Sequence, residues 1–177
     1  MRAAILLALL TPLLALAECP AAFDIQGRAL NSESVLDLCS ARGEKLTLVV
    51  NTASQCGYTP QYKGLQTLHE RYGDRGVSVV GFPATDFRQE YADEARTAKV
   101  CYVNFGVTFP LFATSSVTGE NANALFRQFA AAGKPPRWNF NKYLLDSRGE
   151  LIGYWGASEP PAGGQLEETI RSHLGVE

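Results

Sequence analysis

Four cysteines carry most of the chemistry that this 177-residue sequence offers: Cys19, Cys39, Cys56 and Cys101. A cysteine thiolate is a nucleophile, and an even number of thiols in an oxidising compartment suggests disulfides, with three possible pairings here. None of the spacings is C-x-x-C, and the two histidines lie far apart in the sequence. Because zinc sites need several ligands at characteristic spacings, the sequence predicts thiol chemistry without a metal or another cofactor.

Cys56 lies where a predicted strand is followed by a predicted helix, in "LVVNTASQCGYTPQYKGL", residues 48–65. Residues 48–50 are typical of a buried strand, and the residues after Thr59 and Pro60 are apolar at helical spacing. The partial positive charge of a helix N-terminus favours a thiolate, and reactive cysteines use such positions. Most free cysteines are instead small buried hydrophobes. This stretch therefore leaves both interpretations open, a nucleophile and an inert core thiol.

The segments that must position Cys56 alternate between strands and helices. The pattern predicts apolar strands at 46–50 and 77–82, amphipathic helices at 60–72, 93–105, 123–132 and 165–174, and hairpins at 23–30 and 143–154. Helices that alternate with continuous apolar strands are typical of an α/β domain with a central sheet covered on both faces. We therefore expect one layered α/β domain.

Three local features are predicted in more detail. Gln26 and Gly27 are expected to form the turn of the first hairpin. Thr59 is expected to cap the helix that follows Cys56. The helix that contains Cys101 is expected to bury one apolar face, made of Ala95, Ala98, Tyr102 and Phe105.

Residues 1–17 have the pattern of a secretory signal peptide. Arg2 is followed by an apolar stretch too short to span a bilayer comfortably, and Ala15-Leu16-Ala17 is an A-x-A-type cleavage site. The mature domain, residues 18–177, is then expected to be exported, periplasmic or secreted, without stable membrane insertion. Without Arg2, 15 basic and 18 acidic side chains remain. This balance argues against a nucleic-acid partner.

Four stretches resemble, in order and spacing, the motifs of the glutathione peroxidase family: "VNTASQCGYTPQYKGL", "GVSVVGFPATDFRQE", "CYVNFGVTFPLFA" and "RWNFNKYLLDSRGELIGYW". The resemblance runs from about Phe23 to Tyr154. It implies a thioredoxin-like fold, a central mixed sheet flanked by helices. It also implies reduction of hydroperoxides by the residue at the position of Cys56.

The resemblance implies three polar residues around that nucleophile, Gln89, Trp138 and Asn139. Indole and amide N–H groups can donate to a thiolate and to a departing oxyanion. The loop with Gln89 is one residue shorter than the family's, and its assignment places the deletion between Phe87 and Gln89. Without the resemblance, Gln89 would be interpreted as an exposed side chain, Trp138 as a core aromatic and Asn139 as a turn residue.

The remaining cysteines receive two different roles. Cys101 falls on the resolving cysteine of thioredoxin-dependent members, which condenses with the sulfenic acid left on the nucleophile. The alternative is a packing thiol on a helix face. Cys19 and Cys39 match no family motif, and in an exported protein we expect them to form a structural disulfide. The alternative is that one of them takes part in redox exchange.

The expected function is therefore a thiol peroxidase that reduces hydrogen peroxide and organic or lipid hydroperoxides. A thioredoxin-like protein or glutathione would restore the thiols. The short link before the Trp-Asn-Phe block resembles the monomeric branch of the family. Two alternatives stay open: a peroxide sensor that passes oxidation to a partner protein, and a non-catalytic thioredoxin-like module.

Overall fold

The computed structural model describes residues 19–176. The predicted signal peptide, residues 1–17, lies outside the described residues. Within residues 19–176, no helix is long and apolar enough to cross a membrane.

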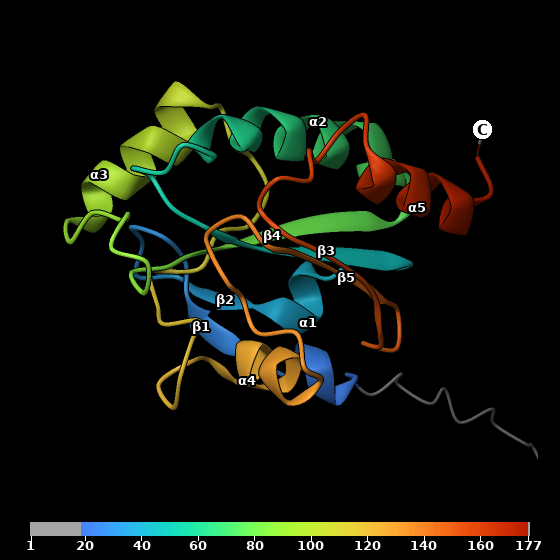
Figure 1. Cartoon of the computed structure of the whole chain (residues 1–177), viewed down its shortest axis with the longest axis horizontal. Coiled ribbons are helices and arrows are strands. Elements are labelled where there is room, and N and C mark those ends of the chain that lie inside the picture. Colours follow the sequence, from blue (N-terminus) through green and yellow to red (C-terminus); the bar gives the residue numbers. More distant parts are fainter. Residues whose placement is uncertain (1–18, 177) are drawn as a thin grey trace, which may run out of the picture.

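A four-stranded mixed sheet forms the centre of the molecule (Figure 1). Its strands, in spatial order, are β4 (Val77–Pro83), β3 (Leu46–Thr52), β5 (Lys142–Asp146) and β6 (Leu151–Trp155). β3 pairs in parallel with β4, and the other two pairings are antiparallel. Every residue of β3 is buried, as expected for a strand with both faces of its sheet covered. The predicted central mixed sheet is confirmed.

Helices cover both faces of this sheet (Figure 1). One face carries α2 (Tyr62–Tyr72), α3 (Glu94–Ala98) and α5 (Gln165–Leu174), and α3 continues as a π-helix, η4 (Lys99–Asn104). The other face carries α1 (Leu38–Ala41), α4 (Ala124–Ala131) and a hairpin of β1 (Gln26–Arg28) and β2 (Val35–Asp37). Short 3₁₀ turns lie at Ala21–Phe23, Thr59–Gln61 and Gly73–Arg75.

Two hydrophobic cores result, one on each face, because successive side chains of a strand point to opposite faces. Leu48 and Val50 of β3 belong to the core beneath α2 and α5. Val49 belongs to the core that contains the buried residues of α4. Cys56 and Cys101 both lie in the first of these cores.

The first hairpin has its turn at a different place from the prediction. β1 and β2 pair Gln26 with Asp37 and Gly27 with Leu36, so the chain reverses between residues 29 and 34. A Cβ atom at Gly27 would lie 3.0 Å from the ring of Phe112. The prediction of a turn at Gln26 and Gly27 is therefore wrong, because the glycine allows close packing inside a strand.

The helical segment that contains Cys101 also differs from the prediction. The segment buries Thr97, Ala98 and Cys101, whereas Ala95 is exposed and Tyr102 is 39% exposed. The buried residues Thr97, Ala98 and Cys101 keep α-helical spacing, so the buried face is rotated away from the predicted one, which is wrong at Ala95 and Tyr102. The chain then widens into a π-turn, seen in the i to i+5 bond from the Phe105 N–H to the Val100 carbonyl.

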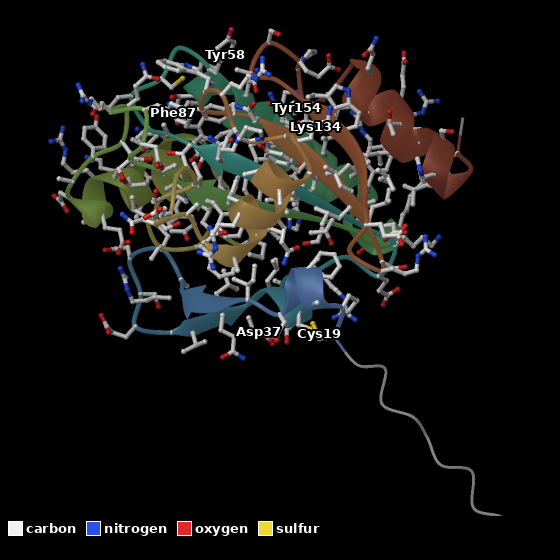
Figure 2. The ribbon with its side chains drawn as sticks, turned by 60° about the horizontal axis from the view of Figure 1, so that its bottom comes forward. Cys19, Asp37, Tyr58, Phe87, Lys134 and Tyr154 are labelled. Atoms are coloured by element: carbon white, nitrogen blue, oxygen red, sulfur yellow. A yellow bond between two sulfur atoms is a disulfide. The ribbon has the colours of Figure 1, made fainter. Side chains whose placement is uncertain are left out.

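Cys19 and Cys39 form a disulfide, with Cα atoms 6.0 Å apart. It joins the start of the described chain to α1. Figure 2 shows Cys19 on the side of the molecule away from Tyr58, which follows Cys56 by two residues.

Candidate active site

Cys56 lies in the turn between β3 and the 3₁₀ turn that leads into α2. Its side chain is 7% exposed. The Cys56 N–H donates to the Thr59 hydroxyl oxygen (3.1 Å), and that hydroxyl lies within donating distance of the carbonyls of Ala53 (2.9 Å) and Cys56 (2.7 Å). Thr59 therefore closes the turn around Cys56. The prediction that it caps the helix is wrong, since the N-cap position of α2 is Gln61 and the Thr59 hydroxyl bonds back to Ala53 and Cys56.

The sulfur of Cys56 faces a backbone donor. The N–H of Tyr58 lies 3.4 Å from the Cys56 Sγ, and the N-terminal end of the following helix points the same partial positive charge toward this turn. Tyr58 itself is 36% exposed. The turn is thus built to accept negative charge on the sulfur close to solvent.

A second segment, Gln89 and Glu90, holds the residues just before Cys56. The N–H of Gln55 donates to the Gln89 carbonyl (2.8 Å), and the N–H of Ser54 donates to the Glu90 carboxylate (3.1 Å). Arg88, just before them, has a φ of 56°, a left-handed conformation that is uncommon without glycine. This conformation accompanies the shortened loop and delivers Gln89 to the Cys56 turn.

The third segment contains Trp138 and Asn139. Asn139 is fully buried, and its Nδ2 donates to the Gln89 Oε1 (3.0 Å). Phe140 has a φ of 60°, and its N–H donates to the Asn51 carbonyl (2.6 Å) at the end of β3. Left-handed residues thus flank both Gln89 and Asn139, and such backbone strain is concentrated at functional sites.

The structure differs from the ordinary interpretations of Trp138 and Gln89, and it adds long-range contacts to that of Asn139. Trp138 is 42% exposed and packs against Phe87, with ring centroids 5.4 Å apart, so it is no core aromatic. Asn139 does lie in a turn, but it is also fully buried and hydrogen-bonded across 50 positions of sequence. Gln89 is partly buried and turns its oxygen toward Asn139, which leaves its Nε2 donor for another acceptor. Figure 2 shows Phe87 and Tyr58 along the upper part of the molecule in that view.

Sequence reasoning missed Asn51 and Glu90 as positioning residues. Asn51 is fully buried; its Nδ2 donates to the Trp138 carbonyl (2.9 Å), and its Oδ1 accepts from the N–H of Asn141 (3.0 Å). The signal was a polar side chain at the end of an apolar strand, because such a side chain needs partners once it is buried.

Cys101 is placed very differently from Cys56. It is fully buried in the π-helix, and its thiol donates to the hydroxyl of Tyr62 (3.2 Å). Burial is the main cause that raises the pKa of Cys101 to about 12, and the nearby charge of Glu90 acts in the same direction. Cys56 and Cys101 are both free thiols. Within residues 19–176, no three His, Cys, Asp or Glu side chains gather in a way that could hold a metal ion.

Comparison with known proteins identifies the family of this chain. The family model described as glutathione peroxidase matches residues 22–130, more than half of the chain. The chain belongs to the glutathione peroxidase family. Hydroperoxy fatty acid reductase of Synechocystis sp. is 43% identical over 129 residues, which cover 66% of this chain and 76% of that protein.

Two further members of the glutathione peroxidase family agree with this assignment. A glutathione peroxidase-like peroxiredoxin of Schizosaccharomyces pombe is 41% identical over 137 residues, covering 73% of this chain and 85% of that protein. Among solved structures, GPX1 of T. cruzi superposes with a TM-score of 0.65 at 26% identity, covering 88% of this chain and 97% of that chain. The thioredoxin-like fold is confirmed, and the chain is a glutathione peroxidase-like thiol peroxidase.

Proposed function

We propose that Cys56 is the nucleophile of this thiol peroxidase and that Gln89, Trp138 and Asn139 are the donors that serve it. The observation that carries the proposal is the hydrogen-bonded chain from the Gln55 N–H through Gln89 to the buried Asn139 amide. This chain gathers segments from three distant parts of the sequence at one thiol. Such convergence of a nucleophile with N–H donors is what peroxide cleavage requires.

The first step forms one bond and breaks another. The Cys56 thiolate attacks the terminal oxygen of the hydroperoxide, the S–O bond forms, and the O–O bond breaks. The sulfur loses two electrons and becomes a sulfenic acid, while the departing alkoxide takes a proton and leaves as an alcohol, or as water when the substrate is hydrogen peroxide. The Gln89 and Trp138 donors stabilise the developing negative charge on that oxygen.

The second step uses Cys101. Its thiolate attacks the sulfenic sulfur of Cys56, the S–S bond forms, the S–O bond breaks, and the departing hydroxide takes up a proton and leaves as water. Because Cys101 is fully buried and its pKa is raised to about 12, the helix around it must open before this attack. A thiol reductant, a thioredoxin-like protein or glutathione, then returns the two electrons and restores both thiols.

The substrates follow from the surroundings of Cys56. The Synechocystis relative is named a hydroperoxy fatty acid reductase. In this chain, Tyr58, two residues after Cys56, and Trp138, which packs against Phe87, expose aromatic surface, and the link of residues 131–137 is short. We therefore include organic and fatty acid hydroperoxides with hydrogen peroxide as substrates of a monomeric enzyme. Aromatic side chains bind apolar chains at low entropic cost.

The compartment is part of the same proposal. A signal peptide at residues 1–17 would direct the mature chain to the periplasm or outside the cell. The protein would act there in the response to oxidative stress. The Cys19–Cys39 disulfide suits an oxidising compartment. N-terminal sequencing of the protein secreted or exported by its host would identify cleavage after Ala17. An intact N-terminus in the cytoplasm would contradict export.

Turnover assays test the function directly. The purified mature protein is supplied with hydrogen peroxide or a fatty acid hydroperoxide, and with reduced thioredoxin or glutathione. We expect repeated turnover with thioredoxin and less with glutathione, because an internal disulfide is a substrate for a dithiol reductant. A single equivalent of peroxide consumed, without turnover on either donor, would instead favour the sensor. No consumption at all would favour the non-catalytic module.

A further inference from the structure

The Glu90 carboxylate connects the two segments that carry the free cysteines. One oxygen, Oε2, accepts from the N–H of Ser54 (3.1 Å), two residues before Cys56. The other, Oε1, accepts from the Thr97 hydroxyl (2.8 Å), four residues before Cys101, and from the N–H of Tyr91 (2.9 Å). One side chain thus touches both segments.

The three hydrogen bonds that the Glu90 carboxylate accepts all come from neutral donors. None of the ion pairs found within residues 19–176 involves Glu90. Thr97 is fully buried on the inner side of α3, so its hydroxyl is held against the carboxylate by packing. Hydrogen bonds to a charged group are the strong ones, and losing one costs more than losing a neutral pair.

We propose that Glu90 is a positioning residue that holds the Cys56 turn in its reactive geometry and restrains the opening of the Cys101 helix. The proposal rests on the proposed function, in which Cys56 attacks peroxide and Cys101 follows. It gives Glu90 opposite effects on the two cysteines. It supports the reaction of Cys56 through Ser54, and it delays the exposure of Cys101 through Thr97.

Three substitutions separate the two contacts. Thr97→Val keeps the size and removes only the hydroxyl, so it releases the helix alone. Glu90→Ala removes both contacts, while the Gln55 N–H to Gln89 carbonyl bond still holds the turn. Glu90→Gln keeps the size but has only one acceptor oxygen, so it cannot satisfy both sides: with that oxygen on the Ser54 N–H, its amide nitrogen faces the Tyr91 N–H, and with the oxygen on Thr97 and Tyr91, the nitrogen faces the Ser54 N–H. Thr67→Val is the matched control, since the Thr67 hydroxyl bonds to the Lys63 carbonyl within α2.

Two measurements follow the two effects separately. The opening of the helix is measured as the rate of thiol labelling of Cys101 in native protein that also carries Cys56→Ser. The reactivity of the turn is measured as the rate constant of Cys56 oxidation by hydrogen peroxide in protein that also carries Cys101→Ser. Neither measurement requires a Cys56–Cys101 disulfide, so a failure of the two-cysteine cycle, seen in wild type by mass mapping, is distinguishable from a failure of this proposal.

We expect Thr97→Val to raise the labelling rate of Cys101 about fivefold and to leave the oxidation rate of Cys56 unchanged, as the loss of one hydrogen bond predicts. Glu90→Ala should raise the first rate by at least as much and lower the second about tenfold, and Glu90→Gln should depart from the parent in at least one of the two rates, by no more than Glu90→Ala does. Unchanged Cys101 labelling in Thr97→Val overturns the proposal, as does an effect equal to that of Thr67→Val. If Glu90→Ala fails to fold, Thr97→Val still tests whether the contact with Thr97 restrains the helix. If Glu90→Ala folds and its Cys56 oxidation rate is unimpaired, the proposed role of Glu90 in the Cys56 turn is wrong.

Discussion

The Cys56 turn and the Cys101 helix place the same functional group in opposite conditions. Both thiols are buried in one hydrophobic core, and their exposed fractions differ only between 7% and 0%. The difference lies in what surrounds each sulfur. Cys56 faces a backbone N–H at the entrance to a helix, whereas the Cys101 thiol is itself the donor, to Tyr62, inside a π-helix. The two thiols thus differ in their hydrogen-bond partners and in the backbone that carries them, as well as in the burial that raises the pKa of Cys101.

The largest expected effect comes from removing the Cys56 thiol. Cys56→Ser replaces the nucleophile by a far weaker one of similar size, so peroxide reduction should fall by about a thousandfold or more. The far-ultraviolet circular dichroism spectrum should stay unchanged. Peroxide consumption with a thioredoxin donor measures the effect. Near-normal turnover in this variant would end the assignment of Cys56.

The next largest effect is the difference between the alkylation rates of Cys56 and Cys101, measured in the same sample. Alkylation of the reduced native protein at pH 8, followed by peptide mapping, should modify Cys56 about a hundredfold or more faster than Cys101, because Cys101 is buried and its pKa is raised to about 12. Denaturant should bring the two rates close together. Equal rates in the native protein would remove the distinction between the two regions.

Loss of the Cys101 thiol should change the product of the oxidation and not the first oxidation of Cys56. After one equivalent of peroxide, wild type should contain a Cys56–Cys101 disulfide, and Cys101→Ser should accumulate sulfenic or over-oxidised Cys56. Thioredoxin-dependent turnover should drop at least about tenfold, since the disulfide that the donor reduces no longer forms. If Cys101→Ser turns over normally with thioredoxin, Cys101 is only a packing residue.

A smaller effect is expected from the polar residue behind the turn. Asn139→Ala removes the donor that orients Gln89, and the rate constant of Cys56 oxidation should fall about tenfold. The control is Asn123→Ala, which removes a helix cap in the other core. That variant should lose about 1 kcal/mol of stability and keep its rate. Equal rate losses in both would make Asn139 a structural residue.

The smallest effect concerns stability against pH. The pKa of Cys101 is raised in the folded state from an ordinary 9.0 to about 12, so its contribution to stability is complete below pH 9 and is lost as the pH rises toward 12. Relative to Cys101→Ala, wild type should therefore lose about 1 kcal/mol of unfolding free energy between pH 8 and pH 10. Urea unfolding at both pH values measures it. A constant difference would contradict the raised pKa.

The hydrophobic pattern was sufficient to predict the sheet and the helices around Cys56. Strand β3 and helix α5 lie where apolar runs and spacing predict them, and α5 spans the predicted residues 165–174. These predictions hold because both depend on local periodicity. Predictions from local pattern fail where a distant contact determines the structure. Gly27 packs against the ring of Phe112 inside a strand, and the hydroxyl of Thr59 bonds to the carbonyls of Ala53 and Cys56.

In the candidate site too, motifs predict some residues, whereas contacts between distant segments determine others. The motif resemblance pointed to Gln89 and Asn139, and the structure brings them into hydrogen-bond contact. Nothing local in the sequence indicates that Glu90 bonds to both Ser54 and Thr97, because those partners lie 36 and 7 positions away. Nor does the helical pattern reveal the π-turn at Lys99–Asn104.

The exposed indole of Trp138 also makes the site observable by light. The chain has two tryptophans, and the other, Trp155, packs against the core from β6. An indole that is 42% exposed emits in a partly aqueous environment, and its emission responds to nearby changes in polarity. In a Trp155→Phe protein, Trp138 would be the single emitter, positioned next to Asn139 in the sequence. Oxidation and reduction of the enzyme would then be followed in real time by its own fluorescence, without an attached dye.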